Sequence, residues 1–226
     1  MRREASRRVL VVGVGGIGSP AALALSGERI DSLALCDGDA VALENLPRQV
    51  LFEDSDVGAP KVAAAAARLR ALRTGLAVEE IPTPFRPGRD AALLERFDVV
   101  IDGTDRIETK LALHADALGK GVAIAVGAAL GLEGHAMLVA PGGRPCYRCH
   151  FRDEPPPGAG LVCAEAGVWP VLPGLVGGLL SRLAMAYLLG GPAGCAGRLF
   201  VADVARGRFR ERRVDADPGC PACGAL

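Results

Sequence analysis

The stretch that decides the fold runs from Val9 to Arg48 and reads VLVVGVGGIGSPAALALSGERIDSLALCDGDAVALENLPR. It opens with a short apolar run, residues 9–12, which is typical of a strand buried on both faces. Three glycines in the spacing G-x-G-x-x-G follow, at Gly13, Gly15 and Gly18. Glycines in this spacing permit a tight turn and bring the backbone close to a phosphate group, which the N-terminus of the next helix stabilises.

A second apolar run follows this turn and ends on an acid. Residues 19–25 are small enough for a helix to pack tightly on the first strand, and Ser32–Cys36 is the expected second strand. Asp37 lies 19 residues past Gly18, where a carboxylate accepts hydrogen bonds from ribose hydroxyls. A merely tight strand–helix turn is the alternative. The strand, the helix and the acid together favour a nucleotide-binding turn.

The rest of the chain alternates between helical and strand patterns. We expect helices at 61–73, 90–96 and 107–119, and strands at 76–81, 97–102 and 122–126. This alternation predicts an α/β fold with a Rossmann-like, doubly wound and mostly parallel sheet, whose ligands bind beyond the carboxyl ends of the strands. The glycine turn, Asp37 and Asp102–Asp105 are therefore expected to meet in one crevice. Three later strands are expected to extend the sheet antiparallel, at 135–140, 198–201 and 209–214.

Composition narrows the class of protein. The 226 residues suit one domain over 1–226, and the pattern shows no repeat and no linker. With 26 basic and 26 acidic residues the net charge is zero, which favours neither nucleic acid nor a membrane surface as a partner. The N-terminal sequence MRREASRRVLVVG runs directly into the first strand and leaves no room for a signal peptide, so we expect a cytoplasmic protein.

One apolar segment, Gly167–Leu189, approaches the length of a membrane span. It contains Pro170, Pro173 and Arg182 and several glycines, and no other segment resembles a span. We therefore expect a buried helix that starts near Leu172.

Four of the seven cysteines form two C-x-x-C pairs, Cys146 with Cys149 and Cys220 with Cys223. In a cytoplasmic chain cysteines are more often metal ligands or reactive thiols than disulfides, and two such pairs are typical of a closed tetrahedral Zn²⁺ site. A redox dithiol is one alternative. Haem attachment is another, because Cys146–His150 reads C-x-x-C-H, but it would leave the second pair unused.

The other three cysteines have different settings. Cys36 ends a buried strand and is expected in the core, and Cys195 sits in a Gly/Pro/Ala loop without further context. Cys163 lies in a proline-rich loop just before Ala164-Glu165-Ala166-Gly167. It is either an incidental loop thiol or a nucleophile.

Polar residues near the expected crevice are candidates to hold a polyphosphate. Asn45, Arg48 and Lys61 flank the loop after Asp37, with arginine as a fork and lysine as a point charge. As isolated residues they would be a solvated surface. Asp102–Asp105 supplies carboxylates at a strand end, the oxygen ligands that Mg²⁺ prefers.

Several of these motifs occur together in one known family. The first is GVGGIG at 13–18, which includes Gly16, and the second is the D-x-D…N-L-x-R-Q run, which includes Asp37, Asp39, Asn45, Arg48 and Gln49. The others are G-x-P-K ending at Lys61, D-x-T-D ending at Asp105, the two cysteine pairs, and C-x-E-A-G starting at Cys163. Over residues 7–224 the chain resembles the ThiF/MoeB/HesA family, relatives of ubiquitin-activating enzymes. These are ATP-dependent adenylyltransferases that act on the C-terminal Gly-Gly of ubiquitin-like sulfur carrier proteins.

The resemblance implies a homodimer that uses ATP and Mg²⁺, contains Zn²⁺, and releases pyrophosphate. It implies a nucleotide-binding half over 1–130 and a carrier and zinc half over 131–226, with a sulfurtransferase as a further partner. Asp37 would bind the ATP ribose, Asp105 would bind Mg²⁺, and Cys163 would link covalently to the carrier. The phosphates would be handled by Asn45, Arg48 and Lys61.

The chain also departs from the family pattern. The family's N-terminal arm, an R-Y-x-R-Q-like sequence whose arginine reaches the partner subunit's site, has no counterpart here, and the candidates to replace it are Arg2, Arg3 and Arg7. Arg106 stands where the family has Asn, and Leu180 and Leu183 stand where it has Gln and Glu. A repurposed family member is therefore one alternative: a peptide-modifying adenylating enzyme, a degenerate partner chain, or a tRNA-modifying relative. A dinucleotide-dependent oxidoreductase is another.

Overall fold

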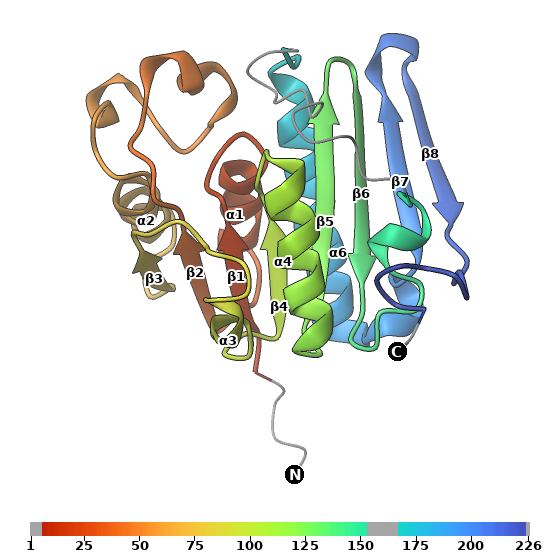
Figure 1. Cartoon of the computed structure of the whole chain (residues 1–226). Helices are drawn as coiled ribbons and strands as arrows, with labels where there is room; N and C mark the ends of the chain where they lie inside the picture. The colour runs from red at the N-terminus through yellow and green to blue at the C-terminus, as the bar shows by residue number, and fades with distance from the viewer. Residues whose placement is uncertain (1–5, 153–166, 225–226) are drawn as a thin grey trace.

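The computed structural model describes residues 6–152 and 167–224 and contains one eight-stranded sheet of order β3-β2-β1-β4-β5-β6-β7-β8 (Figure 1). The strands are β1 (Arg8–Val12), β2 (Ser32–Cys36), β3 (Ala77–Ile81), β4 (Val99–Asp102), β5 (Ala123–Leu130), β6 (Glu133–Val139), β7 (Arg198–Asp203) and β8 (Arg208–Arg213). Strands β1 to β5 pair in parallel, whereas β5 to β8 pair antiparallel. The predicted α/β fold with an antiparallel extension is confirmed.

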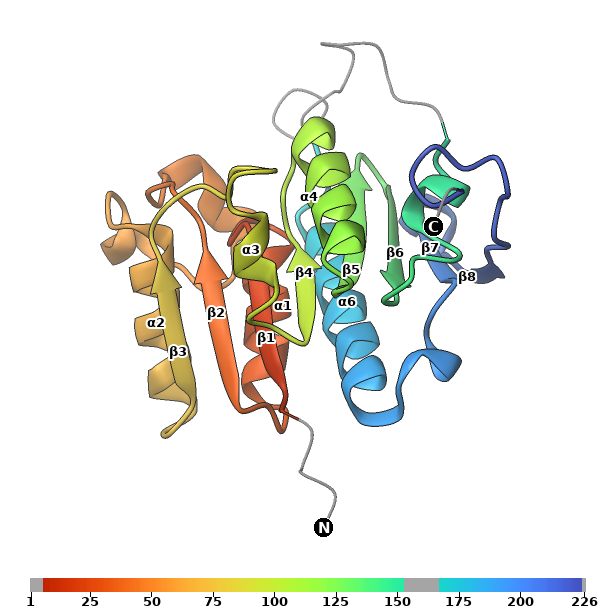
Figure 2. The same ribbon diagram turned by 60° about the horizontal axis from the view of Figure 1, so that its bottom comes forward.

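Helices cover both faces of the sheet (Figures 1 and 2). They are α1 (Gly18–Ser26), α2 (Lys61–Leu72), α3 (Ala91–Leu94), α4 (Ile107–Gly119) and α6 (Val171–Gly190). Along β1, Val9 and Val11 enter a core shared with α1, α2 and α6, while Leu10 and Val12 enter a second core shared with α3 and α4. Successive side chains of a strand point to opposite faces, so β1 supplies both cores, which explains why it is apolar from Val9 to Val12.

The strand order reverses between β1 and β4. From β1 the chain moves outward to β2 and β3, then crosses back to β4 on the other side of β1. In sheets of this kind, ligands bind in the crevice outside the carboxyl ends of the strands at the point of reversal. The glycine turn follows β1 at this point, and Asp37 and Gly103 directly follow the two neighbouring strands.

Helix α6 is the segment whose length and apolar composition resemble a membrane span, and it alone among the described helices passes that test. It packs against α1 and against β5 and β6. A Cβ atom added at Gly177 would lie 2.4 Å from the Ile17 carbonyl oxygen, and one added at Gly16 would lie 3.3 Å from Pro173 Cβ. The helix therefore packs as the expected core helix, with its first turns against the glycine turn.

Strand β5 is longer than the sequence pattern predicts. The apolar run was expected to end at Val126, but the strand continues through Gly127 to Leu130. A Cβ atom at Gly127 would lie 2.8 Å from Val176 Cγ1, so this glycine makes room for α6 rather than ending the strand. Strand β2 and helix α4 have their predicted bounds, 32–36 and 107–119, and the other elements differ by a few residues.

Candidate active site

The glycine turn after β1 is closed by backbone contacts that leave no room for side chains. Gly13 has a φ of +83°, and its N–H donates to the Cys36 carbonyl at 2.8 Å. A Cβ atom added at Gly18 would lie 1.8 Å from the Gly13 carbonyl oxygen, and one added at Gly103 would lie 2.3 Å from it. The turn, the start of α1 and the end of β4 are therefore in contact, and the N–H groups that begin α1 lie at the carboxyl edge of the sheet.

Asp37, at the end of β2, is tied to this turn by both carboxylate oxygens. Its Oδ2 accepts a hydrogen bond from the Val14 N–H at 2.7 Å, and its Oδ1 accepts one from the Asp39 N–H at 2.8 Å. Two carboxylate oxygens offer about four lone-pair positions, so two remain for further donors. The side chain is partly exposed and is held in one orientation, as a receptor for ribose hydroxyls requires.

Arg48 lies over the glycine turn. It ends a short 3₁₀ helix (Leu43–Arg48), and its Cγ lies 3.4 Å from the Cβ position of Gly16. Its guanidinium donates to Asn45 Oδ1 at 2.6 Å and to the Glu44 carbonyl at 3.1 Å. The structure brings Asn45 and Arg48 together as a pair that presents further N–H donors beside the turn.

Lys61 begins α2 and is almost fully buried, although its sequence context resembled a surface. Its side chain is 7% exposed, and its Nζ lies 2.8 Å from Oδ2 of Asp39, whose side chain is 73% exposed. The Lys61 N–H also donates to the Asp39 carbonyl at 2.9 Å. The ammonium is therefore held at the site by an exposed carboxylate that can yield to a phosphate.

Only one of the two carboxylates in the segment 102–105 is available to an external cation. Asp102 is fully buried and lies 2.7 Å from Nζ of Lys110 on α4, so the expectation that it would face the crevice is wrong. Burial in the second core forces it to pair inside the protein. Asp105 is exposed in the loop that follows. Of this pair, Asp105 remains the candidate ligand for Mg²⁺.

Most of the sequence-predicted residues thus meet at one edge of the sheet. They are joined by the contacts of Gly13 with Gly103, Val14 with Asp37, Gly16 with Arg48, and Asp39 with Lys61. Gly15 also lies here, with its Cβ position 3.7 Å from Nε2 of Gln49. Cys163, the candidate nucleophile, lies outside the described residues.

Two polar residues at this edge have no role assigned from the sequence: Gln49 is named there only as part of a motif, and Lys110 is not named at all. Gln49 is 3% exposed, and its Oε1 has no hydrogen-bond partner among the described residues. Lys110 is 3% exposed and lies on the same buried face of α4 as Leu113 and Ala117. The available signal for Lys110 was a lysine at helical spacing from apolar residues, just after an acid-bearing strand end.

The four cysteines of the two C-x-x-C pairs gather in one place. Their sulfur atoms all lie within 4.8 Å of one another. The Sγ separations are 3.6 Å for Cys146 and Cys220, 3.4 Å for Cys149 and Cys223, and 4.0 Å for Cys146 and Cys149. A tetrahedron of sulfurs at about 2.3 Å from Zn²⁺ has S–S edges of about 3.8 Å. The separations fit a tetrahedral thiolate site and exceed the length of a disulfide.

Burial and backbone donors act differently on these thiols. Burial raises the pKa of Cys146, and it raises the pKa of Cys223 to about 11. Burial also acts to raise the pKa of Cys220, but backbone N–H groups of Cys223 and Ala222 bring it down to about 7. A divalent cation would stabilise all four as thiolates. His150 is not among the four and packs edge-on against Phe151.

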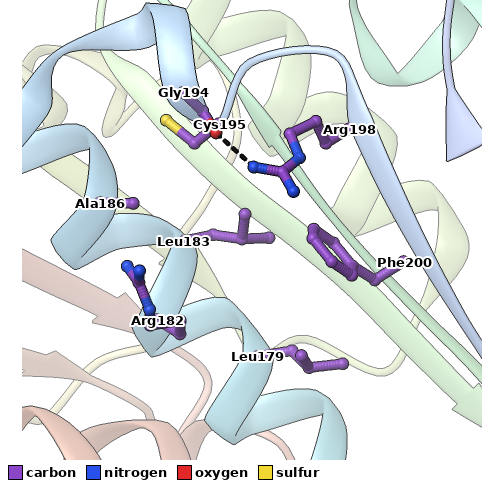
Figure 3. Close-up of a pocket in the computed structure, with 8 residues that line it drawn as sticks. All are labelled: Leu179, Arg182, Leu183, Ala186, Gly194, Cys195, Arg198 and Phe200. Atoms are coloured by element: carbon purple, nitrogen blue, oxygen red, sulfur yellow. Dashed lines mark hydrogen bonds between the residues drawn. The ribbon is translucent and has the colours of Figure 1, made fainter. Parts of the chain in front are cut away.

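A shallow cavity of about 220 Å³ lies elsewhere, between α6 and β7 (Figure 3). Its lining includes Leu183, Phe200 and the buried Cys195. The Arg198 guanidinium at its edge is already bonded to Glu211 through two contacts of 2.6 Å and to the Gly194 carbonyl. None of the residues predicted to bind nucleotide lines this cavity, so it is separate from the candidate active site.

Comparison with known proteins places the chain in a family. Residues 2–222 match the ThiF family. The chain is 37% identical over 222 residues to the sulfur carrier protein adenylyltransferase of Thermus thermophilus, covering 96% of this chain and 82% of that one. It is 35% identical over 220 residues to the molybdopterin-synthase adenylyltransferase of Escherichia coli, covering 96% and 87%.

Solved structures agree on the fold. The crystal structure of E. coli MccB with ATP superposes with a TM-score of 0.82 at 18% identity, covering 98% of this chain and 68% of that one. At this identity the likeness concerns architecture alone. The family match over nearly the whole chain and the sequence identity to curated relatives establish the assignment: this chain belongs to the ThiF family.

Proposed function

We propose that this protein is an adenylyltransferase that uses ATP to adenylate the C-terminal Gly-Gly carboxylate of a ubiquitin-like sulfur carrier protein. The observation that carries the proposal is the meeting of the glycine turn, Asp37, Arg48, Lys61 and Gly103 at the point where the strand order reverses, with Asp105 exposed two residues past Gly103. The T. thermophilus relative, which is 37% identical over 96% of this chain, is named as a sulfur carrier protein adenylyltransferase.

Each side chain has a role that suits its position. Asp37 accepts hydrogen bonds from the ribose, and the backbone from Gly13 to Gly18 lies along the phosphates. Arg48, oriented by Asn45, and Lys61, released from Asp39, neutralise the polyphosphate. Asp105 is the carboxylate that would hold Mg²⁺, which when bound spreads the charge that develops on the phosphates.

The reaction needs cations and alignment rather than a base. A carboxylate oxygen of the carrier bonds to the α-phosphorus of ATP, and the bond to the β-phosphate oxygen breaks, so that pyrophosphate leaves with the electron pair. The attacking carboxylate is already ionised at neutral pH, so no side chain has to remove a proton. Its repulsion from the phosphates is the main barrier, which Arg48 and Lys61 lower by placing positive charge at the site.

The zinc half has a supporting role in this proposal. The four thiols fit a structural Zn²⁺ that ties the segment after β6 to the C-terminus. We further infer a homodimer, a cytoplasmic location, and a sulfurtransferase as a later partner. The nucleotide-binding half covers 1–130 and the carrier and zinc half covers 131–226. The described cysteines are all free thiols, which suits a reducing compartment.

The test is carrier-dependent exchange of pyrophosphate into ATP. Arg48→Ala and Lys61→Ala should each lower the exchange rate by about 10²-fold or more, because each removes positive charge from the transition state. Arg96→Ala, which deletes an exposed arginine paired with Glu79, is the matched control and should exchange normally. Binding of NAD⁺ in place of ATP, or full exchange in both site variants, would overturn the proposal.

Cys163 would act after adenylation, when its thiolate attacks the carrier's acyl carbon and AMP leaves. Cys163→Ser should therefore keep pyrophosphate exchange and lose any covalent link between enzyme and carrier. Mass spectrometry of the reaction mixture measures that link, and a wild-type yield of carrier thiocarboxylate from the serine variant would contradict the covalent role.

A further inference from the structure

A buried ion pair lies directly behind the candidate Mg²⁺ ligand. Asp102, at the end of β4, is fully buried, and Lys110, on α4, is 3% exposed. Oδ2 of Asp102 lies 2.7 Å from Nζ of Lys110. Removing two charges from water is costly, and a buried pair is seldom more stable than two apolar residues of similar volume. Fold stability alone therefore does not account for the pair.

The second oxygen of Asp102 holds the turn that carries Asp105. Oδ1 accepts hydrogen bonds from the Thr104 N–H at 2.9 Å and from the Thr104 hydroxyl at 2.6 Å. Gly103, inside the same turn, donates its N–H to the Val12 carbonyl at 2.8 Å. The position of Asp105 thus depends on the orientation of the Asp102 carboxylate.

Lys110 is what fixes that orientation. Without a cation on Oδ2, a buried carboxylate would rotate or take up a proton, and its bonds to Thr104 would weaken. The neighbouring histidines do not replace the lysine. His114 and His135 are buried, which lowers the pKa of each to about 4, so both are neutral at pH 7.

We propose that Lys110 is a positioning residue for adenylation: by locking Asp102 it holds the Gly103–Asp105 turn so that Asp105 meets the Mg²⁺ of bound ATP. The inference rests on the proposed function and deepens it. The chain of contacts runs from Lys110 Nζ through the Asp102 carboxylate and the Thr104 backbone to the neighbouring Asp105.

The test separates positioning from stability. Because Lys110→Met alone leaves a buried carboxylate unpaired, the informative variant is the apolar pair Asp102→Leu with Lys110→Leu. We expect it to unfold near the wild-type temperature while exchanging pyrophosphate about 10²-fold more slowly, since misplacement by about 1 Å costs rate on that order. Lys110→Arg, which keeps a cation beside Asp102, should exchange pyrophosphate at most of the wild-type rate. Lys120→Met, which removes an exposed lysine paired with Glu95 at the end of α4, is the matched control.

A binding measurement supplies a readout other than rate. Calorimetric titration measures the affinity for ATP once in EDTA and once in excess Mg²⁺. Without metal, the apolar pair should bind ATP within about twofold of the wild type, but it should lose most of the increase in affinity that Mg²⁺ gives. Three outcomes for the double variant would overturn the positioning role: exchange at the wild-type rate, normal binding of MgATP, or failure to fold. An Lys110→Arg variant that exchanges pyrophosphate as slowly as the apolar pair would also overturn it. If wild-type enzyme shows no carrier-dependent exchange, the proposed function itself fails, and the titration still tests whether Lys110 governs Mg²⁺ binding.

Discussion

Replacing Gly18 by alanine tests the backbone closure of the glycine turn. The added Cβ would lie 1.8 Å from the Gly13 carbonyl oxygen, whereas real Cβ contacts begin near 3.0 Å, so the turn and α1 must separate by at least about 1.2 Å (3.0 − 1.8). Gly13 is held by its bond to the Cys36 carbonyl, so neither side can rotate away. Overpacking costs about 1–3 kcal/mol, and a clash between two backbone segments belongs at the upper end. For a chain of this length, about 3 kcal/mol lowers the melting temperature by about 6–12 °C.

The assay is thermal unfolding together with ATP binding, and the chain offers a matched control. Gly178, in the middle of α6, has no described atom outside its own helix backbone within 4 Å of its Cβ position. Gly178→Ala should therefore raise stability by about 0.5–1 kcal/mol, because alanine favours helix more than glycine does. Gly18→Ala should in addition weaken ATP binding, since the displaced turn no longer fits the phosphates. A Gly18→Ala protein that melts and binds ATP like the wild type would refute the close contact on which this reasoning depends.

Two further predictions concern the zinc half and a buried histidine. Cys220→Ser should lose one Zn²⁺ per chain, measured by elemental analysis, and should melt at a lower temperature, because metal-binding free energy is partly folding free energy; protein purified without chelators that contains no zinc would contradict it. Burial lowers the pKa of His114 from 6.5 to about 4, so between pH 6.5 and pH 4 this residue takes up a proton on unfolding. It therefore lowers the free energy of unfolding increasingly as the pH falls below 6.5, and has no such effect above pH 6.5. His114→Leu should therefore reduce the loss of unfolding free energy between pH 7 and pH 5 by about 2 kcal/mol, measured by urea titration at both values, and an unchanged loss would show that the histidine is not neutral in the folded state.

The sequence predicts the backbone of the site well because its signals are local. The glycine spacing from Gly13 to Gly18 and the acid at Asp37 follow from what a turn and a strand end require, and the structure places them together. The cysteine pairs are also predictable, because thiols at this spacing have few roles. Cys146 and Cys220 then meet at 3.6 Å although 74 residues separate them.

Residues whose role depends on packing could not be predicted in this way. Lys61 resembled a surface cation and is almost fully buried, and Asp102 resembled a metal ligand and is an internal partner of Lys110. Gly127 resembled a strand end because the sequence does not show that α6 would cross there. In each case the deciding neighbour lies on another element, so the periodicity of a single segment does not reveal the contact.

The contact between Pro173 and Gly16 also has a consequence for biosynthesis. Pro173 follows Gly16 by 157 residues (173 − 16), and its Cβ lies 3.3 Å from the Cβ position of that glycine. Translation proceeds at about 5–20 residues per second, so a ribosome needs about 8–30 s to deliver the helix that packs against a turn it made at the outset. During that interval the glycine turn of the nascent chain lacks its packing contact with α6. The first motif to be translated is thus among the last to be completed, and a nascent chain should acquire affinity for ATP only after α6 has emerged.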